Sequence, residues 1–349
     1  MPGAGGVSAR RRLARLVRTG SPRVVARAAR RELVSRRHEA ALARAAGEGR
    51  RLLVGPFLGE VGFELLYWIP VVRRLLAEHG VGRERVAVLT RGGAGSWYHD
   101  CAERSLDILD LIPPDRYLAE LVERRRRGGD AKQFFPDELD SRLARQAIEQ
   151  IGDAAVVHPL LMFSRMRFVL EGLEPPARAT ALADYGRLAW AERPLPAACP
   201  AEFVAVKLYF SDSFPDDAGS RNLAARLLEA LAEHSEVVVL TSGRQLDEHR
   251  EWVPTGGSIH DASGWVTPQD NLAVQTAVVA RARALVSTYG GFSYLGPMLG
   301  VPTLAVHTRE AFSRVHLEVL RSAFPEADYT LGGQDAVEGI SRFADRAVR

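Results

Sequence analysis

The feature that constrains this chain most is a repeated alternation, from residue 51 onward, between short β-branched apolar runs and stretches with helical periodicity. This alternation predicts an α/β fold with parallel sheets, because parallel neighbours need a crossover that is usually a helix. Runs such as VVVL indicate strands buried on both faces. The expected strands are 51–57, 86–90, 154–159, 202–210, 236–243, 284–288 and, as the last strand, 301–308; the expected helices are 63–80, 139–152, 221–235, 271–282 and 291–300.

A change of composition predicts where the domains meet. Residues 174–200 are rich in proline and alanine, which indicates a connection between two compact units. A chain of 349 residues is long enough for two such domains. We therefore expect two Rossmann-like, doubly wound domains, whose ligands bind at the carboxyl ends of the strands in a cleft between them. The predicted division is an arm over 1–50, an N-terminal domain over 51–175, a linker over 176–200 and a C-terminal domain over 201–349.

The arm carries most of the positive charge. Residues 1–51 hold fourteen arginines and three glutamates, a net charge of +11, so the rest of the chain carries −8 within the total of +3. Residues 10–45 are typical either of a basic, weakly amphipathic helix pair on an anionic membrane surface or of a solvated, partly disordered extension. The arm has no continuous apolar stretch and no aromatic residue, so neither a signal peptide nor nucleic-acid binding is expected.

The sequence gives no support for a metal site or a bound cofactor. Cys101 and Cys199 lie far apart in sequence, and the chain contains neither an Asp-X-Asp triplet nor an HExxH motif. Free cysteines without a CxxC pattern favour a reducing, cytoplasmic compartment.

The stretch FLGEVGFELLYWIP, which follows the first strand, contains the first candidate site. Gly59 and Gly62 permit a tight turn at the acceptor side of the cleft, and the carboxylate of Glu60 lies at the start of a helix, where it could act as a general base. The alternative is that Glu60 only caps the helix. Glu64 is expected to be a first-turn carboxylate that pairs with the helix dipole.

The second candidate site is STYGGFSYLGPMLGVP, residues 287–302. A strand runs into Tyr289, Gly290 and Gly291, and the next helix opens at Ser293. Backbone N–H groups at such a junction can hold a phosphate, and the Ser293 hydroxyl could add a donor. A tight turn that merely needs positive φ is the alternative.

Further residues could complete a diphosphate site. Lys207 alternates onto one strand face, Arg221 opens the following helix, and Ser242 follows the next strand. A surface role for Arg221 and a simple turn at Ser242 are the alternatives. His158 ends a strand on the acceptor side, and we expect Asp270 to be a structural N-cap.

Taken together, these motifs resemble the ADP-heptose:lipopolysaccharide heptosyltransferases, glycosyltransferase family 9. The similarity lies in Leu58-Gly59-Glu60 with Pro70 downstream, and in the stretch from 259 to 306 that ends in a short helix, Gly-x-Pro-Thr and a strand. It implies a GT-B fold, an acceptor in the N-terminal domain, a nucleotide-sugar in the C-terminal domain and a metal-independent, inverting transfer with Glu60 as base. Because the family's strand-end aspartate is replaced within Ser287-Thr288-Tyr289-Gly290-Gly291, the resemblance does not extend to heptose.

The function expected from the sequence is therefore transfer of a sugar from a nucleotide-sugar to a hydroxyl acceptor, in the synthesis of a cell-surface polysaccharide or glycoconjugate. Two alternatives stay open. One is another polysaccharide-modifying transferase, similar to a fucosyl- or pyruvyltransferase. The other is a non-catalytic binding or scaffold protein of the same fold, in which side chains would fill the cleft between Glu60 and residues 289–291.

Overall fold

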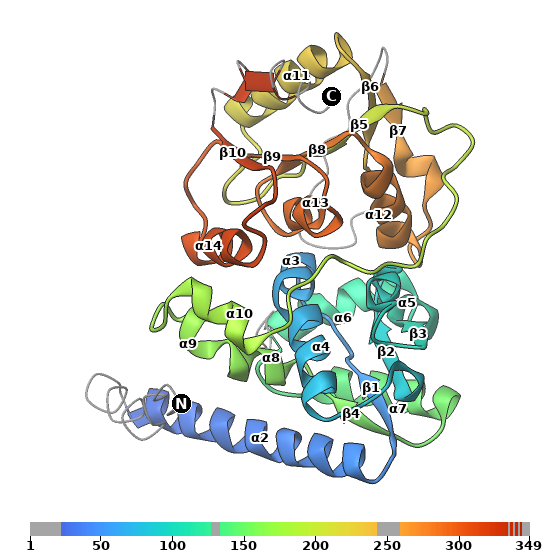
Figure 1. The fold of residues 1–349 in the computed structure, drawn as a ribbon, viewed down its shortest axis with the longest axis vertical. Helices are drawn as coiled ribbons and strands as arrows, with labels where there is room; N and C mark the ends of the chain where they lie inside the picture. The colour runs from blue at the N-terminus through green and yellow to red at the C-terminus, as the bar shows by residue number, and fades with distance from the viewer. Residues whose placement is uncertain are drawn as a thin grey trace.

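The computed structural model describes residues 22–126, 133–242 and 259–333, together with Ala336, Val337, Gly339, Ile340 and Phe343. Over these residues the chain forms two parallel sheets, one above the other in Figure 1, with helices packed around each and an extended segment joining them. The α/β architecture with two doubly wound units, predicted from the alternation of strands and helices, is confirmed.

The N-terminal sheet has the described strand order β3 (Arg104–Asp107), β2 (Val86–Thr90), β1 (Arg51–Val54), β4 (Ala154–Val157), with all pairs parallel. The strand order reverses between β1 and β4, which is where ligands bind in open α/β sheets. The helices of this half are α3 (Val61–Phe63), α4 (Ile69–Glu78), α5 (Ile108–Leu111), α6 (Pro114–Arg126), α7 (Glu138–Ile151), α8 (Leu160–Arg165), α9 (Arg167–Leu170) and α10 (Ala179–Leu182).

The C-terminal sheet has the described order β10 (Tyr329–Gly332), β9 (Thr303–Val306), β8 (Ala284–Thr288), β5 (Phe203–Lys207), β6 (Glu236–Val239), β7 (Ile259–Asp261), again all parallel. This is the Rossmann order, and its reversal lies between β5 and β8. Its helices are α11 (Ala218–Ala232), α12 (Asn271–Arg281), α13 (Leu295–Leu299) and α14 (Arg314–Ala323).

Three strands were not predicted, and 301–308 is not the last strand. β3, β7 and β10 are short and lie on sheet edges, and β10 follows α14. Their residues are largely exposed or half-buried, unlike the fully buried β2, β5 and β8. An edge strand of three or four residues needs no apolar run, so hydrophobic pattern alone does not reveal it.

The helix expected over 63–80 runs from Val61 to Glu78 but contains a π-helical turn, η1 (Glu64–Trp68). All five residues of η1 are buried. A π-turn inside a helix is rare and is frequently found at functional sites. It lies directly after the loop that carries Glu60.

The described part of the arm is one long helix, α2 (Pro22–Gly47). The first part of the predicted arm, residues 1–21, lies outside the described residues. It lies along the bottom of the N-terminal half in Figure 1 and contacts α8, β4 and β1. Ser35, Leu42 and Ala45 on its inner face are buried. Among the described helices, none is long and apolar enough to cross a membrane.

The two halves share one continuous core. Phe63 and Tyr67 from the N-terminal half belong to the same buried cluster as Tyr289, Phe292 and Tyr294 from the C-terminal half. Helix α14 contacts α10 and the adjacent 3₁₀ turn η4 (Pro176–Arg178), so the chain returns to the N-terminal side after β9. The boundary between the halves is therefore packed like a protein interior.

Candidate active site between two sheet edges

The points of strand reversal in the two sheets lie against each other. The loop after β1 and the turn after β8 are in contact, through α3 and the 3₁₀ turn η6 (Gly291–Tyr294). Each follows the carboxyl end of a strand that borders the reversal. Both candidate sites recognised in the sequence therefore occupy the position where open α/β sheets bind ligands.

The first loop, Gly55–Glu60, is tied to both neighbouring strands. The N–H of Gly55 donates to the Val157 carbonyl at 2.9 Å, and the N–H of Phe57 donates to the Leu89 carbonyl at 3.0 Å. Glu60 occupies the N-cap position of α3, yet its side chain makes no capping hydrogen bond and is exposed. The capping alternative is therefore not what the structure shows, and the carboxylate is available at the surface.

The cleft is closed at the point where the sequence predicted it to be open. A Cβ atom on Gly62 would lie 2.6 Å from the Gly291 Cα, and one on Gly291 would clash with the Gly62 backbone nitrogen. The two glycines allow the first loop and the glycine turn to touch backbone to backbone. A donor therefore cannot lie between these two residues in this conformation.

The glycine turn uses most of its own donors. The N–H of Tyr289 donates to the Val306 carbonyl at 2.8 Å, and the N–H of Ser293 donates to the Gly290 carbonyl at 3.0 Å. The N–H of Gly290 points to the Ser293 Oγ at 3.4 Å. The Ser293 hydroxyl is buried, 2.8 Å from the Gly290 carbonyl and 2.9 Å from the Tyr329 hydroxyl. In this conformation the closed turn satisfies the polar groups of Tyr289, Gly290 and Ser293 internally. Binding of a diphosphate by residues 289–293 stays a prediction.

Lys207 lies at the carboxyl end of β5, across the strand reversal from the glycine turn. Its Nζ is buried, donates to the Leu240 carbonyl at 2.7 Å and lies 5.6 Å from the centre of the Phe292 ring. Ser242 is also buried, at the carboxyl end of β6. A buried ammonium group at this edge is a local positive charge beside the turn that follows β8.

Arg221 does not join this group. It lies in the first turn of α11, with its guanidinium 2.6 Å from the Asp216 carboxylate, and its side chain is 60 % exposed. The surface alternative is the correct one for this residue. The reason is local: Asp216 is five residues away and lies within reach at the same helix end.

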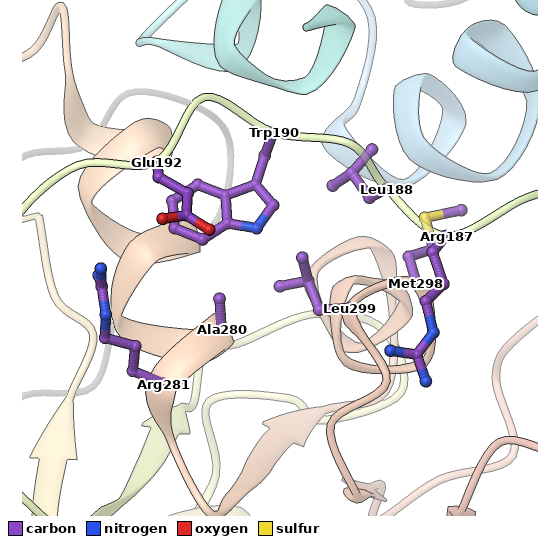
Figure 2. Close-up of a pocket in the computed structure, with 8 residues that line it drawn as sticks. All are labelled: Arg187, Leu188, Trp190, Glu192, Ala280, Arg281, Met298 and Leu299. Atoms are coloured by element: carbon purple, nitrogen blue, oxygen red, sulfur yellow. The ribbon is translucent and has the colours of Figure 1, made fainter. Parts of the chain in front are cut away.

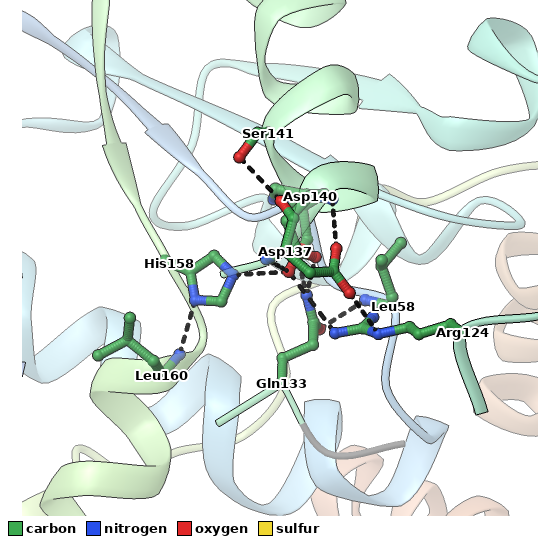
Figure 3. Close-up of polar contacts among 9 residues, drawn as sticks. Leu58, Arg124, Gln133, Asp137, Asp140, Ser141, His158 and Leu160 are labelled. Carbon is green, nitrogen blue, oxygen red and sulfur yellow. Dashed lines mark hydrogen bonds and ion pairs between the residues drawn. The ribbon is translucent and has the colours of Figure 1, made fainter. Parts of the chain in front are cut away.

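His158 does not face a ligand site. It is buried, its Nδ1 accepts from the Leu160 N–H at 3.1 Å, and its Nε2 lies 3.3 Å from the Asp140 carboxylate (Figure 3). Both ring nitrogens therefore have partners within the N-terminal half, and the acceptor-side role of His158 stays a prediction. Among the described residues, no group of three or more His, Cys, Asp or Glu side chains is arranged to hold a metal ion.

Glu64, expected to be a simple first-turn carboxylate, is fully buried in η1. One carboxylate oxygen accepts from the Thr90 hydroxyl at 2.6 Å and the Tyr98 hydroxyl at 2.9 Å, and the other lies 3.5 Å from the Arg91 guanidinium. Burial raises the pKa of Glu64, against the opposing effect of Arg91. From the π-helical turn η1, the Glu64 side chain reaches Thr90 at the carboxyl end of β2. Glu60, four residues earlier, is exposed.

The second loop of the N-terminal half also meets the C-terminal half through glycines. The N–H of Leu272 donates to the Gly92 carbonyl at 2.6 Å, and a Cβ on Gly93 would lie 3.0 Å from the Asp270 Cα. Asp270 occupies the N-cap position of α12 but accepts from the Thr267 N–H and hydroxyl instead of capping the helix. The predicted capping by Asp270 is therefore wrong; its carboxylate instead holds the loop that precedes α12.

A separate hollow of about 360 Å³ lies between the linker and the C-terminal ends of α12 and α13 (Figure 2). It is bordered by both apolar and charged side chains and does not include Glu60, Lys207 or the glycine turn. Its lining residues are Arg187, Leu188, Trp190, Glu192, Ala280, Arg281, Met298 and Leu299.

Several residues near the site carry no motif that sequence could reveal. Gln133, Asp140 and Tyr98 are buried polar side chains, and Trp97 donates from its indole to the Thr276 hydroxyl across the boundary at 2.8 Å. Each becomes significant only through partners far away in sequence.

No family model and no curated protein matches the sequence. Similar solved structures include the E. coli ADP-heptose LPS heptosyltransferase II, 12 % identical over 86 % of this chain and 100 % of that one, with a TM-score of 0.44. The E. coli heptosyltransferase WaaC with ADP is 13 % identical over 85 % and 99 %, with a TM-score of 0.43. A glycosyl transferase family 9 protein from Veillonella parvula is 16 % identical over 84 % and 89 %, with a TM-score of 0.42. These are the proteins that the sequence resemblance named; at these values, function has to be argued from the chain's own residues.

Proposed function

We propose that this protein is a metal-independent glycosyltransferase that moves a sugar from a nucleotide-sugar to a hydroxyl acceptor. One observation carries the proposal: the loop with the exposed Glu60 and the turn after β8 come from two different parallel sheets and meet at both points of strand reversal. A transferase that joins two substrates needs such a meeting point.

In this proposal the carboxylate of Glu60 removes the proton from the acceptor hydroxyl as the oxygen attacks the anomeric carbon. The bond from that carbon to the diphosphate breaks, and the leaving group takes the electron pair. Lys207 is the buried cation on the donor side and stabilises the departing diphosphate. The acceptor lies on the N-terminal side, next to Gly59.

The Gly62–Gly291 contact excludes the donor from the space between these two glycines. We place the diphosphate beside this contact, at the carboxyl ends of β5 and β6, where Lys207 and Ser242 are found. The backbone of Gly291 then forms the wall of the donor site that touches the first loop. A bulky side chain at 291 would push this wall away from Glu60.

The first experiment is a thermal-shift screen of the purified protein against UDP-, GDP-, ADP-, TDP- and CMP-sugars without added metal. A ligand that binds only the folded state stabilises it by about 2.7 kcal/mol at a hundredfold excess over Kd. We expect a selective rise in Tm with one nucleotide, and loss of that rise in Gly291→Val. If no nucleotide-sugar raises Tm, the non-catalytic alternative is preferred.

The second experiment tests the chemistry once the donor is identified. Glu60→Gln keeps the size of the side chain but removes the base, and general-base catalysis contributes about 10²- to 10⁴-fold to rate. We expect turnover to fall by that order with donor binding unchanged. Glu103→Gln is the control, because Glu103 is also exposed. Near-normal turnover of Glu60→Gln would contradict the proposed base.

We also propose that the outer face of α2 contacts an anionic membrane at its cytoplasmic side. Arg36, Arg37 and Arg44 are exposed on this helix, and each arginine near such a surface contributes about 1 kcal/mol. Sedimentation with phosphatidylserine vesicles should fall in the double variant Arg37→Glu, Arg44→Glu and with rising salt. Equal binding to neutral phosphatidylcholine vesicles would contradict this interpretation.

A further inference from the structure

A buried amide holds the first loop in place. Gln133 is 1 % exposed and makes three hydrogen bonds: its Oε1 accepts from the Leu58 N–H at 2.7 Å, and its Nε2 donates to the Pro56 carbonyl at 2.8 Å and to the Asp140 carboxylate at 2.8 Å (Figure 3). Two of the three partners belong to the loop that ends at Glu60. They are 75 and 77 residues away in sequence.

The orientation of this amide is fixed by its partners. Leu58 can only donate, whereas the Pro56 carbonyl and an ionised Asp140 can only accept, so reversing the amide would break all three bonds. Burial alone would raise the pKa of Asp140, but the hydrogen bond from His158 and the charge of Arg124 hold it below its ordinary value. Asp140 therefore stays ionised at neutral pH, and the amide stays in one orientation.

Helix α2 contacts the two phenylalanines that follow Gln133. The Arg31 guanidinium lies 3.6 Å from the centre of the Phe134 ring, and that of Arg30 lies 5.2 Å from the centre of the Phe135 ring. The Phe134 ring in turn packs at 4.7 Å against Phe163 of α8. The residues that follow Gln133 are thus packed between the arginine-rich helix and the N-terminal half.

We propose that Gln133 is a positioning residue that sets the conformation of the first loop, and that Arg30 and Arg31 of α2 brace it. We call the hold of Gln133 on residues 56–58 the clamp; its evidence is the pair of hydrogen bonds to the Leu58 N–H and the Pro56 carbonyl. Its consequence for catalysis, that Gln133 places the Glu60 carboxylate, rests on the proposed function. Under this proposal, helix α2 helps to hold the first loop in place, in addition to its proposed contact with an anionic membrane.

Hydrogen exchange tests the clamp without any substrate. Replacing Gln133 by Ala removes the acceptor of the Leu58 N–H, and one lost hydrogen bond of about 1.4 kcal/mol corresponds to about tenfold faster exchange. We expect this acceleration in peptides covering residues 55–60. Gln150→Ala, at an exposed position of α7, is the control and should leave these peptides unchanged. Unchanged exchange in Gln133→Ala would overturn the clamp.

A second variant keeps the test decisive if Gln133→Ala does not fold. In Gln133→Glu the new carboxyl must be protonated to donate to the Pro56 carbonyl, and the neighbouring Asp140 favours that protonated form. The protonated carboxyl has one O–H and replaces only one of the two bonds that the amide donates, so after correction for intrinsic rates the loop should exchange more slowly at pH 5 than at pH 8. Exchange that does not depend on pH would overturn the assignment.

The brace is tested by Arg31→Ala with Arg37→Ala as the matched control on the same helix. We expect faster exchange of residues 133–137 and of the first loop only in Arg31→Ala; equal exchange in both variants would overturn the brace.

The kinetics of Gln133→Ala test whether Gln133 places the Glu60 carboxylate for catalysis. We expect a lower kcat with little change in the KM for the donor, and an unchanged kcat would overturn this role of Gln133. If the parent protein itself transfers no sugar, the proposed function fails, while the exchange results still decide the clamp.

Discussion

Gly62 and Gly291 meet backbone to backbone at the boundary between the two sheets, with a Cβ on Gly62 placed 2.6 Å from the Gly291 Cα. This contact joins the loop that carries Glu60 to the turn that follows β8. It is possible only because both positions lack a side chain. The distance between the two candidate sites is therefore set by two glycines.

Adding one methyl group at this contact should separate the two loops. We expect Gly62→Ala to lower the free energy of unfolding by about 1–3 kcal/mol, the usual cost of overpacking. Urea unfolding measures the change. Gly264→Ala is the control, because a Cβ at Gly264 would meet nothing within 4 Å. Equal stability of the two variants would show that the contact is not tight in solution.

The hydrogen bond between Trp97 and Thr276 should couple the two halves. Both side chains are buried, and the bond crosses from the N-terminal to the C-terminal half at 2.8 Å. A double-mutant cycle with Trp97→Phe and Thr276→Val should give a coupling free energy of about 0.5–1.5 kcal/mol. Purely additive effects in urea unfolding would contradict this contact.

Helix α2 should contribute to stability through its inner face only. Leu42 is 2 % exposed and Leu33 is 51 % exposed on the same helix. We expect Leu42→Ala to cost about 2–4 kcal/mol and Leu33→Ala less than about 0.5 kcal/mol. Thermal unfolding of the two variants makes the comparison. A small, equal effect of both would favour a solvated arm instead.

Stability should fall as pH rises through the titration of Asp107. Burial raises the pKa of this carboxyl from 3.8 to about 6, although the N–H groups of Gly93 and Leu109 donate to it. Between these values the folded state binds more protons than the unfolded state, so Asp107 favours folding at pH 4 and loses that contribution by pH 6. The size is about 1–3 kcal/mol.

Asp107→Asn cannot titrate, so its free energy of unfolding should depend less on pH between 4 and 6 than that of the parent protein. The control is Asp115→Asn, at an exposed position of α6. Urea unfolding at pH 4, 5 and 6 gives the slopes. A slope in Asp107→Asn equal to that of the parent would rule out this carboxyl as the source.

The local pattern of the sequence was sufficient for the main strands and helices. β2, β5 and β8 are buried along their whole length because both faces of the sheet are covered, and each begins with a continuous apolar run that can be read directly. The turns after β1 and β8 could be located from their glycines and from strand polarity, and the structure brings them into contact. The edge strands β3 and β10 were missed because they are short and only partly buried.

The sequence by itself thus determined the parallel α/β architecture and the position of the glycine-containing turns after β1 and β8, since hydrophobic period and glycine placement act over a few residues. Only the tertiary structure decided what each polar side chain does. Glu60 and Glu64 are four residues apart, yet one is exposed and the other is fully buried against Thr90 and Tyr98. Gln133 and His158 likewise take their roles from partners that meet them only in the fold. Burial and hydrogen-bond satisfaction depend on segments distant in sequence, so no local pattern specifies them.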